Sequence, residues 1–264
     1  MAAIHRLRFS MAGLRNRIAI VTGASSGIGE ATARELSAQG AGVVVAARRQ
    51  ERLEALAAEL SAAGQRVLAV RADASSESDN ARLIERAQAF SHELGCAGRI
   101  DILIANAGRG LAGGLLSSEQ SQWDNLYKLN VLGPADLMRR AGALMVEQKS
   151  GDIIALGSVS GFNISPFSGF YGSTKFAIAS IAEAFRREVC SRGVRVTTIM
   201  PAVVISEFQE NAGYTKENFY KTIEKFGTPL APQDVARSIA FIVSQPPHVH
   251  INQLIIRPTG QDYP

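Results

Sequence analysis

The chain has 264 residues, of which 46% are hydrophobic and 20% charged, and this composition excludes collagen-like and disordered chains. A globular chain of this length can bury one large apolar core. The formal net charge is +4, and three arginines without any acid stand among the first sixteen residues, so the body of the chain is nearly neutral and no nucleic-acid-binding surface is expected.

Apolar patterning predicts strands that alternate with helices along the chain. Short β-branched runs predict seven strands, at Ile18–Thr22, Val43–Ala47, Val67–Val70, Asp101–Ala105, Asp152–Leu156, Val194–Ile199 and Leu254–Ile256. Apolar spacings of three and four predict helices at Ile28–Gln39, Glu51–Ala63, Ser76–Leu94, Ser118–Gln148, Tyr171–Arg192 and Gln233–Val243. Such alternation gives right-handed crossovers. We therefore expect an α/β fold, a single doubly wound Rossmann domain with a parallel seven-stranded sheet and helices on both faces.

We expect this domain to cover residues 14–264, after a flexible basic N-terminal arm, 1–13, for which a transit peptide or a natural start at Met11 are alternatives. The segment 203–230 lacks periodicity and is long for a connection, which favours an active-site lid over a surface excursion. Cys96 and Cys190 form no C-x-x-C pair, and no apolar run reaches the about 18 residues of a membrane helix. A cytoplasmic protein without a disulfide is expected.

A glycine-rich turn, T-G-A-S-S-G-I-G, follows the first predicted strand and leads into the first helix. Its glycines let the backbone approach a phosphate, and the helix directs free N–H groups and its positive dipole end toward a pyrophosphate. The residues expected to bind a dinucleotide in this turn are Gly23, Ser25, Ser26, Gly27, Ile28 and Gly29.

Arg48 and Arg49 end the second predicted strand, where an NAD site usually has an acid for the ribose 2′-hydroxyl. An acid would repel a 2′-phosphate, whereas an arginine binds it through charge-assisted hydrogen bonds. The pair therefore favours NADP(H). The alternative is that both arginines are solvated residues at the start of a helix.

Tyr171 and Lys175 are four residues apart in a predicted helix and share one face of it. A nearby cation lowers the pKa of a phenol, ordinarily near 10, toward the range useful for proton transfer at pH 7. Taken alone, this spacing is common by chance. Ser158 strengthens it, because it follows another predicted strand and precedes the tyrosine by thirteen residues, so its hydroxyl is expected beside the phenol.

These motifs, in order with Asn106-Ala107-Gly108 and Asn130, make the chain from about Leu14 to its end similar to the short-chain dehydrogenase/reductase family. The resemblance implies that Tyr171 is the catalytic acid/base and that Ser158 orients the substrate carbonyl. It implies that Lys175 lowers the pKa of the tyrosine and holds the nicotinamide ribose, while Asn130 supports a water relay to the lysine. The further cofactor contacts that it implies are Asp73, Ala74, Asn106, Ala107, Gly108, Pro201, Ala202, Val204 and Ser206.

Three positions depart from the family pattern: Ala105 for an asparagine, Ala202 for a glycine and Ser206 for a threonine. None removes a catalytic group, so an active enzyme is expected. The stretch S-Q-P-P-H-V at 244–249, Asn252, the R-P-T at 257–259 and the A-R-R-x-x-R-L run at 47–53 resemble the branch of NADP-dependent serine and β-hydroxy-acid dehydrogenases.

The sequence thus predicts an NADP(H)-dependent oxidoreductase that interconverts a secondary alcohol, a β-hydroxy acid among the candidates, and a ketone. A 3-oxoacyl-type carbonyl reductase and a non-catalytic nucleotide-binding regulator are the alternatives; a methyltransferase would usually have an acid in place of Arg48. Arg109 is either a ligand for a substrate carboxylate or a solvated side chain. His248 and His250 lack the partners of a metal site, and none is expected.

The partners expected are a small-molecule carbonyl or alcohol substrate, and neither nucleic acid nor a membrane. The resemblance implies a homodimer or homotetramer, assembled through the helix that contains Trp123 and Tyr127 and the helix that begins at Tyr171. Within the chain, Trp123 and Tyr127 are expected to be packing residues.

Overall fold

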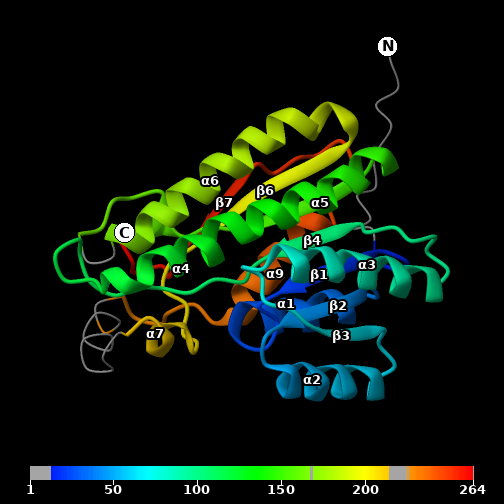
Figure 1. The fold of residues 1–264 in the computed structure, drawn as a ribbon, viewed down its shortest axis with the longest axis horizontal. Coiled ribbons are helices and arrows are strands. Elements are labelled where there is room, and N and C mark those ends of the chain that lie inside the picture. The colour runs from blue at the N-terminus through cyan, green and yellow to red at the C-terminus, as the bar shows by residue number, and fades with distance from the viewer. Residues whose placement is uncertain (1–12, 167–168, 214–223, 225, 264) are drawn as a thin grey trace, which may run out of the picture.

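The computed structural model describes residues 13–166, 169–213, 224 and 226–263. Its core is one sheet of seven parallel strands in the order β3-β2-β1-β4-β5-β6-β7 (Figure 1). The strands are β1 (Ile18–Thr22), β2 (Gly42–Ala47), β3 (Val67–Arg71), β4 (Ile102–Ala105), β5 (Gly151–Leu156), β6 (Val194–Pro201) and β7 (Gln253–Ile256). The predicted seven-stranded, doubly wound α/β fold is confirmed.

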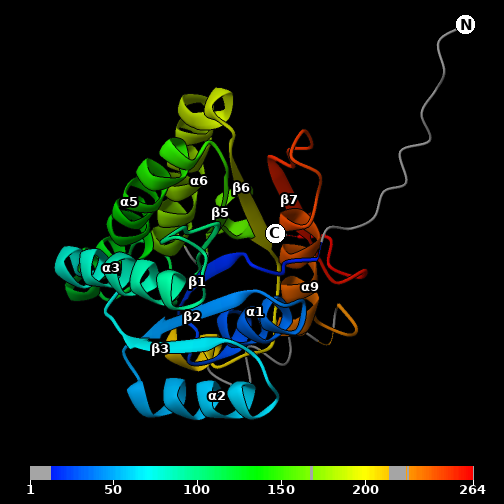
Figure 2. The ribbon, with the colours of Figure 1, turned by 90° about the vertical axis from the view of Figure 1, so that its right-hand side faces the viewer.

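Helices cover both faces of this sheet (Figure 2). One face packs against α1 (Gly27–Ala38), α2 (Gln50–Ala62) and α9 (Pro232–Val243). The other packs against α3 (Glu77–Glu93), α5 (Gly133–Gln148) and α6 (Gly169–Val189). Buried aliphatic side chains fill both layers, because strands enclosed on two sides need apolar residues at most of their positions.

The helix predicted at Ser118–Gln148 is present as an unbroken helical run from Gln120 to Gln148, but it is not one regular α-helix. It consists of a 3₁₀ turn (Gln120–Gln122), α4 (Trp123–Tyr127), a π-helical turn (Lys128–Leu132) and α5. The change of pitch occurs where the chain passes the loop after β3: a Cβ on Gly133 would lie only 2.0 Å from the carbonyl oxygen of Ala74. Backbone must therefore approach backbone here, and a helical turn with an extra residue is common beside functional sites.

Trp123 and Tyr127 are packing residues, as predicted. The Trp123 ring stacks on Phe170 with a centroid separation of 4.2 Å, and the Tyr127 hydroxyl lies 2.9 Å from the hydroxyl of Ser173. These contacts hold α4 against the first turns of α6, the helix that contains Tyr171.

A buried ion cluster closes the amino-terminal edge of the sheet. Asp152, at the start of β5, is 3% exposed and binds the guanidinium groups of Arg17 and Arg195. Arg195 also donates to the carbonyl oxygens of Gln245, Pro246 and Val249, at 2.8–3.0 Å. The S-Q-P-P-H-V stretch at 244–249 is thus a loop clamped to the sheet, at the edge opposite the ends of the strands that carry the motifs.

No helix in the described ranges is long and apolar enough to cross a membrane. The basic arm 1–13 lies outside the described residues except for Gly13, and so does the middle of the proposed lid, 214–223 and 225. The described part of the lid runs from 203 to 213 and contains the short helix α7 (Phe208–Asn211).

Candidate active site

A cavity of about 1090 Å³ opens at the carboxyl ends of the strands. It spans the junction between β1 and β4, where the strand order reverses direction, the place at which open α/β sheets bind ligands. One end is lined by the glycine-rich turn and the arginines after β2, and the other by Ser158, Tyr171 and Lys175. One cavity is therefore lined by both parts of the predicted site, the dinucleotide-binding part and the catalytic part.

Nearly all the residues predicted for the site line this one cavity. They are Gly23, Ser25, Ser26, Gly27, Ile28, Arg48, Arg49, Asp73, Ala74, Asn106, Ala107, Gly108, Ser158, Tyr171, Lys175, Pro201, Ala202, Val204 and Ser206. Gly29 and Asn130 do not line it. Gly29 packs closely against the glycine-rich turn, and Asn130 forms hydrogen bonds with residues next to the cavity.

The turn after β1 is shaped for close backbone approach. A Cβ on Gly29 would lie 2.4 Å from the carbonyl oxygen of Gly23, so only glycine lets α1 begin this close to the strand. The side-chain amide of Asn106 donates 2.7 Å to the carbonyl oxygen of Thr22 and ties the end of β4 to this turn. The N-terminus of α1 consequently faces the cavity and can accept an anionic group.

The two arginines after β2 have different surroundings. Arg49 donates to the hydroxyls of Ser25, at 3.0 Å, and Ser26, at 2.7 Å, and forms an ion pair with Glu207. Arg48 lies toward the loop after β3, where with Asp73 and others it lines a side cavity of about 270 Å³. Both arginines line the large cavity at this end, together with the acids Asp73 and Glu207.

Lys175 is buried under the Tyr171 ring on the cavity side of α6. Its Nζ lies 5.8 Å from the ring centroid and donates 2.8 Å to the carbonyl oxygen of Leu156, the last residue of β5. The lysine is only 5% exposed, and burial lowers its pKa from the ordinary 10.5 to about 8. It is still mostly protonated at pH 7, so a positive charge lies beside the phenol.

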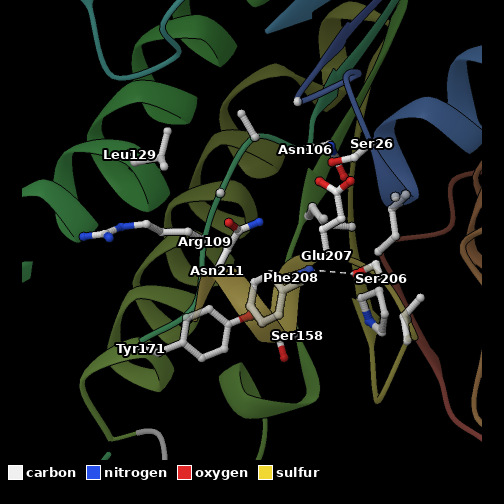
Figure 3. A pocket seen from close by; sticks show the side chains of 18 of the residues that line it. Ser26, Asn106, Arg109, Leu129, Ser158, Tyr171, Ser206, Glu207, Phe208 and Asn211 are labelled. Carbon is white, nitrogen blue, oxygen red and sulfur yellow. Dashed lines mark hydrogen bonds between the residues drawn. The ribbon is translucent and has the colours of Figure 1, made fainter. Parts of the chain in front are cut away.

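Ser158 stands where β5 gives way to a 3₁₀ turn, Val159–Gly161. Its hydroxyl accepts a hydrogen bond of 3.1 Å from the N–H of Ser160, which fixes the side chain at the start of the turn. Figure 3 shows the Tyr171 ring directed toward Ser158 and Phe208. Phe208 meets the tyrosine edge to face, with a centroid separation of 5.7 Å. A hydroxyl pair beside a buried ammonium and an aromatic cover can bind and protonate a carbonyl oxygen.

Asn130 lies in the π-helical turn and is 2% exposed. Its oxygen accepts 3.0 Å from the N–H of Arg109, and its amide donates 2.9 Å to the Arg109 carbonyl and 3.1 Å to the Thr174 hydroxyl. The side chain thereby fixes the loop after β4 against α6. The water relay implied by the resemblance stays a prediction.

Arg109 extends away from Ser158 (Figure 3). Its Nη1 donates 2.9 Å to the side-chain oxygen of Gln122, and its Nη2 donates 3.3 Å to the Gln122 carbonyl. In this arrangement the guanidinium is held by the start of the α4 region. The arginine therefore stabilises that region, and its guanidinium is not directed toward Ser158.

The contacts of three cavity residues were not predicted, although two of them lie in the segment 203–230 that was expected to be a lid. Glu207 and Phe208 come from the segment before and within α7, and Gln261 comes from the C-terminal tail, where its oxygen accepts 3.2 Å from the N–H of Val203. None carries a local signal, because each acts on residues more than thirty positions away in the chain.

Among the described residues, no group of three or more histidines, cysteines or acids is arranged so that it could hold a metal ion. His250, one of the two histidines weighed from the sequence, uses its Nε2 on the backbone of Val196, with contacts of 2.9 and 3.0 Å. Its role here is to pack the C-terminal loop against β6.

Comparisons with known proteins agree with this architecture. The short chain dehydrogenase family model matches residues 17–217. An uncharacterized oxidoreductase of Staphylococcus epidermidis is 33% identical over 94% of this chain and 100% of its own length. A closed form of serine dehydrogenase complexed with NADP⁺ aligns with a TM-score of 0.83 and 30% identity over 93% of this chain and 96% of the other. A metagenomic short-chain oxidoreductase in complex with NADP aligns with a TM-score of 0.76 and 29% identity, over 94% of this chain and 99% of the other.

The chain belongs to the short chain dehydrogenase family, and the predicted membership is confirmed.

Proposed function

We propose that the protein is an NADP(H)-dependent oxidoreductase that interconverts a secondary alcohol and a ketone, with Tyr171 as the general acid/base. The observation that carries the proposal is the placement of the Tyr171–Lys175 pair and Ser158 at one end of a cavity whose other end is a glycine turn flanked by arginines. The membership of the family and the oxidoreductase relatives support the reaction class.

The residues of the cavity fit a phosphorylated dinucleotide. The close approach at Gly29 and the start of α1 suit the pyrophosphate, and the two arginines Arg48 and Arg49 suit a 2′-phosphate. Two of the similar structures are complexes with NADP. The remaining contacts would come from Asp73 and Ala74 to the adenine, Asn106 to Gly108 and Lys175 to the sugars, and Pro201 to Ser206 to the nicotinamide amide.

The coenzyme, when bound, supplies or accepts the hydride. The chain's own residues handle the proton and the carbonyl oxygen. In the reducing direction, the Tyr171 hydroxyl donates its proton to the substrate oxygen while the Ser158 hydroxyl donates a hydrogen bond to the same atom. The Lys175 ammonium stabilises the phenolate that remains, because it is a buried charge with little water to screen it. Phe208 covers the tyrosine ring and limits the access of water.

The experiment is the variant Tyr171→Phe, which removes one oxygen from the site. It should fold, bind NADPH with an unchanged Kd and lose turnover by about 10²–10⁴-fold, the usual contribution of general acid–base catalysis. Tyr127→Phe is the matched control, because its hydroxyl lies on α4 and contacts Ser173 instead. Full activity of Tyr171→Phe would overturn the proposed mechanism.

A β-hydroxy acid is the substrate class that the similarity to serine dehydrogenase favours. The apolar cluster around Tyr171, which includes Leu111 and Phe208, also suits a neutral carbonyl compound or a 3-oxoacyl group. A panel of β-hydroxy acids, neutral secondary alcohols and 3-oxoacyl thioesters, assayed with NADPH and NADP⁺, distinguishes these classes. No turnover on any member would favour the non-catalytic, nucleotide-binding alternative.

We also propose that the chain acts in the cytoplasm as a homodimer or homotetramer. Both cysteines are free in the structure, which suits a reducing compartment. Exposed apolar side chains lie on the helices implied as the interface, with Leu132 59% and Phe176 41% exposed. Light scattering of the purified protein measures the assembly directly.

A further inference from the structure

The carboxylate of Glu207 lies between two arginines at the end of the cavity assigned to the 2′-phosphate. Its Oε2 is 2.8 Å from Nη1 of Arg49, and its Oε1 is 2.6 Å from Nη1 of Arg52 in α2. The hydrogen bonds from Arg49 and then Arg52 hold the pKa of Glu207 below its usual value. The residue is thus an anion at neutral pH with both oxygens engaged.

The Glu207 carboxylate occupies a hydrogen-bond donor of Arg49 that a coenzyme phosphate would also use. The Nε and Nη2 of its guanidinium already donate to Ser25 and Ser26 in the glycine-rich turn, and Glu207 takes the remaining nitrogen, Nη1. A 2′-phosphate would need that same donor, because an anion binds arginine through the N–H groups at the edge of its plane. Carboxylate and phosphate cannot both keep the full pairing.

We propose that Glu207, which Arg52 holds in place, is a specificity residue that competes with the 2′-phosphate of NADP(H) for Arg49. Binding of NADP(H) breaks the pairing of Glu207 with Arg49, whereas NAD(H), which has a hydroxyl at this position, leaves it intact. The carboxylate therefore weakens the preference for NADP(H) that the arginines create. The inference rests on the proposed coenzyme and on no part of the chemical step.

Glu207 could instead have a purely structural role, in which it holds the segment before α7 in place. The experiment must distinguish this role from competition with the phosphate. Glu207 directly precedes α7, whose Phe208 packs on Tyr171, and its neighbour Ser206 lies against the glycine turn near Gly27. A purely structural tie would hold this segment over the whole coenzyme. Its loss would then weaken NADPH and NADH to the same extent, whereas loss of a competitor strengthens NADPH alone.

The test is Glu207→Gln, which keeps the size of the side chain and removes its charge. Dissociation constants are measured by fluorescence or calorimetric titration for NADPH, NADH, 2′,5′-ADP and 5′-ADP. We expect about three- to tenfold tighter binding of NADPH and 2′,5′-ADP, since one like charge is removed within a few ångströms of the phosphate. NADH and 5′-ADP should change less than twofold. The gain should shrink as salt is raised, because this end of the cavity is partly exposed.

Glu210→Gln is the matched control, since it removes the same charge from an exposed position in the same segment, outside the cavity. It should leave all four dissociation constants within twofold. The proposal is wrong if Glu207→Gln changes all four ligands by one factor, weakens NADPH, or has no effect beyond that of Glu210→Gln.

Should Glu207→Gln fail to fold, Arg52→Gln provides the same test from the other side. It leaves Glu207 to pair with Arg49 alone and should weaken NADPH and 2′,5′-ADP while sparing NADH and 5′-ADP; equal effects on all four ligands would refute the competition. These are binding measurements, so an enzyme that turns over no tested substrate would still confirm or refute the role of Glu207.

Discussion

Replacing Lys175 with methionine should make the coenzyme-free protein more stable while removing its activity. The lysine is 5% exposed, and the one hydrogen bond identified for its ammonium group goes to the Leu156 carbonyl. Methionine has a similar length, is apolar and flexible, and can fill the same space without a charge. The variant therefore separates the cost of burying the ammonium group from its use in the proposed reaction.

The magnitude follows from the pKa of the lysine. A pKa lowered from 10.5 to about 8 corresponds to a burial cost on the order of 3 kcal/mol at neutral pH. Loss of the hydrogen bond to Leu156 offsets about 1 kcal/mol of this gain. We expect Lys175→Met to raise the free energy of unfolding by about 2 kcal/mol at pH 7, or the Tm by roughly 5 °C.

The pH dependence has a definite sign. Because the folded-state pKa is lowered, the cost is fully present below about pH 8 and disappears as pH rises toward 10.5, where the unfolded chain also loses the proton. Urea denaturation of both proteins from pH 7 to pH 10 should show the advantage of Lys175→Met shrinking over this range. A variant less stable than the wild type at pH 7, with a constant difference up to pH 10, would refute the reasoning.

Two further changes test the parts of the fold that hold the site. Asp152→Asn should destabilise the protein by about 3 kcal/mol, because it leaves the partly buried Arg17 and Arg195 without their carboxylate; thermal denaturation measures the loss, and an altered Kd for NADPH in the folded protein would contradict the separation of this cluster from the site. Gly133→Ala should weaken NADPH at least severalfold while the chain still folds, because the added methyl group must displace the Ala74 loop; coenzyme titration that shows an unchanged Kd would mean that this loop does not touch the adenosine.

The sheet and most of the site could be predicted from the sequence because their signals are local. Strands enclosed on both faces read as β-branched runs, and the residues that follow them meet at one edge of a parallel sheet. This placed Ser158 and Tyr171 together although they are thirteen positions apart. The same logic placed the glycine turn and Arg48 at one end of the cavity.

The parts that could not be predicted depend on contacts between distant segments. The π-helical turn around Asn130 keeps an ordinary apolar pattern, and its cause, the approach of Gly133 to Ala74, lies in tertiary packing. Glu207 pairs with Arg52, 155 positions earlier, and no sequence pattern predicts a pair so far apart. Arg109 follows the cofactor loop directly, yet Gln122 determines where its side chain points.

The clamp of Arg195 and Asp152 at the amino-terminal edge of the sheet has a consequence for protein engineering. The residues that secure the scaffold lie at one end of the strands, and those that contact ligands lie at the other. Libraries that vary the exposed positions of the segment 203–213 to obtain new substrates, and keep the buried Val204 and Ala212, should therefore cost the scaffold little stability. Variants that have lost stability during such selection should be repaired at the amino-terminal edge, where added cross-links leave the chemistry untouched.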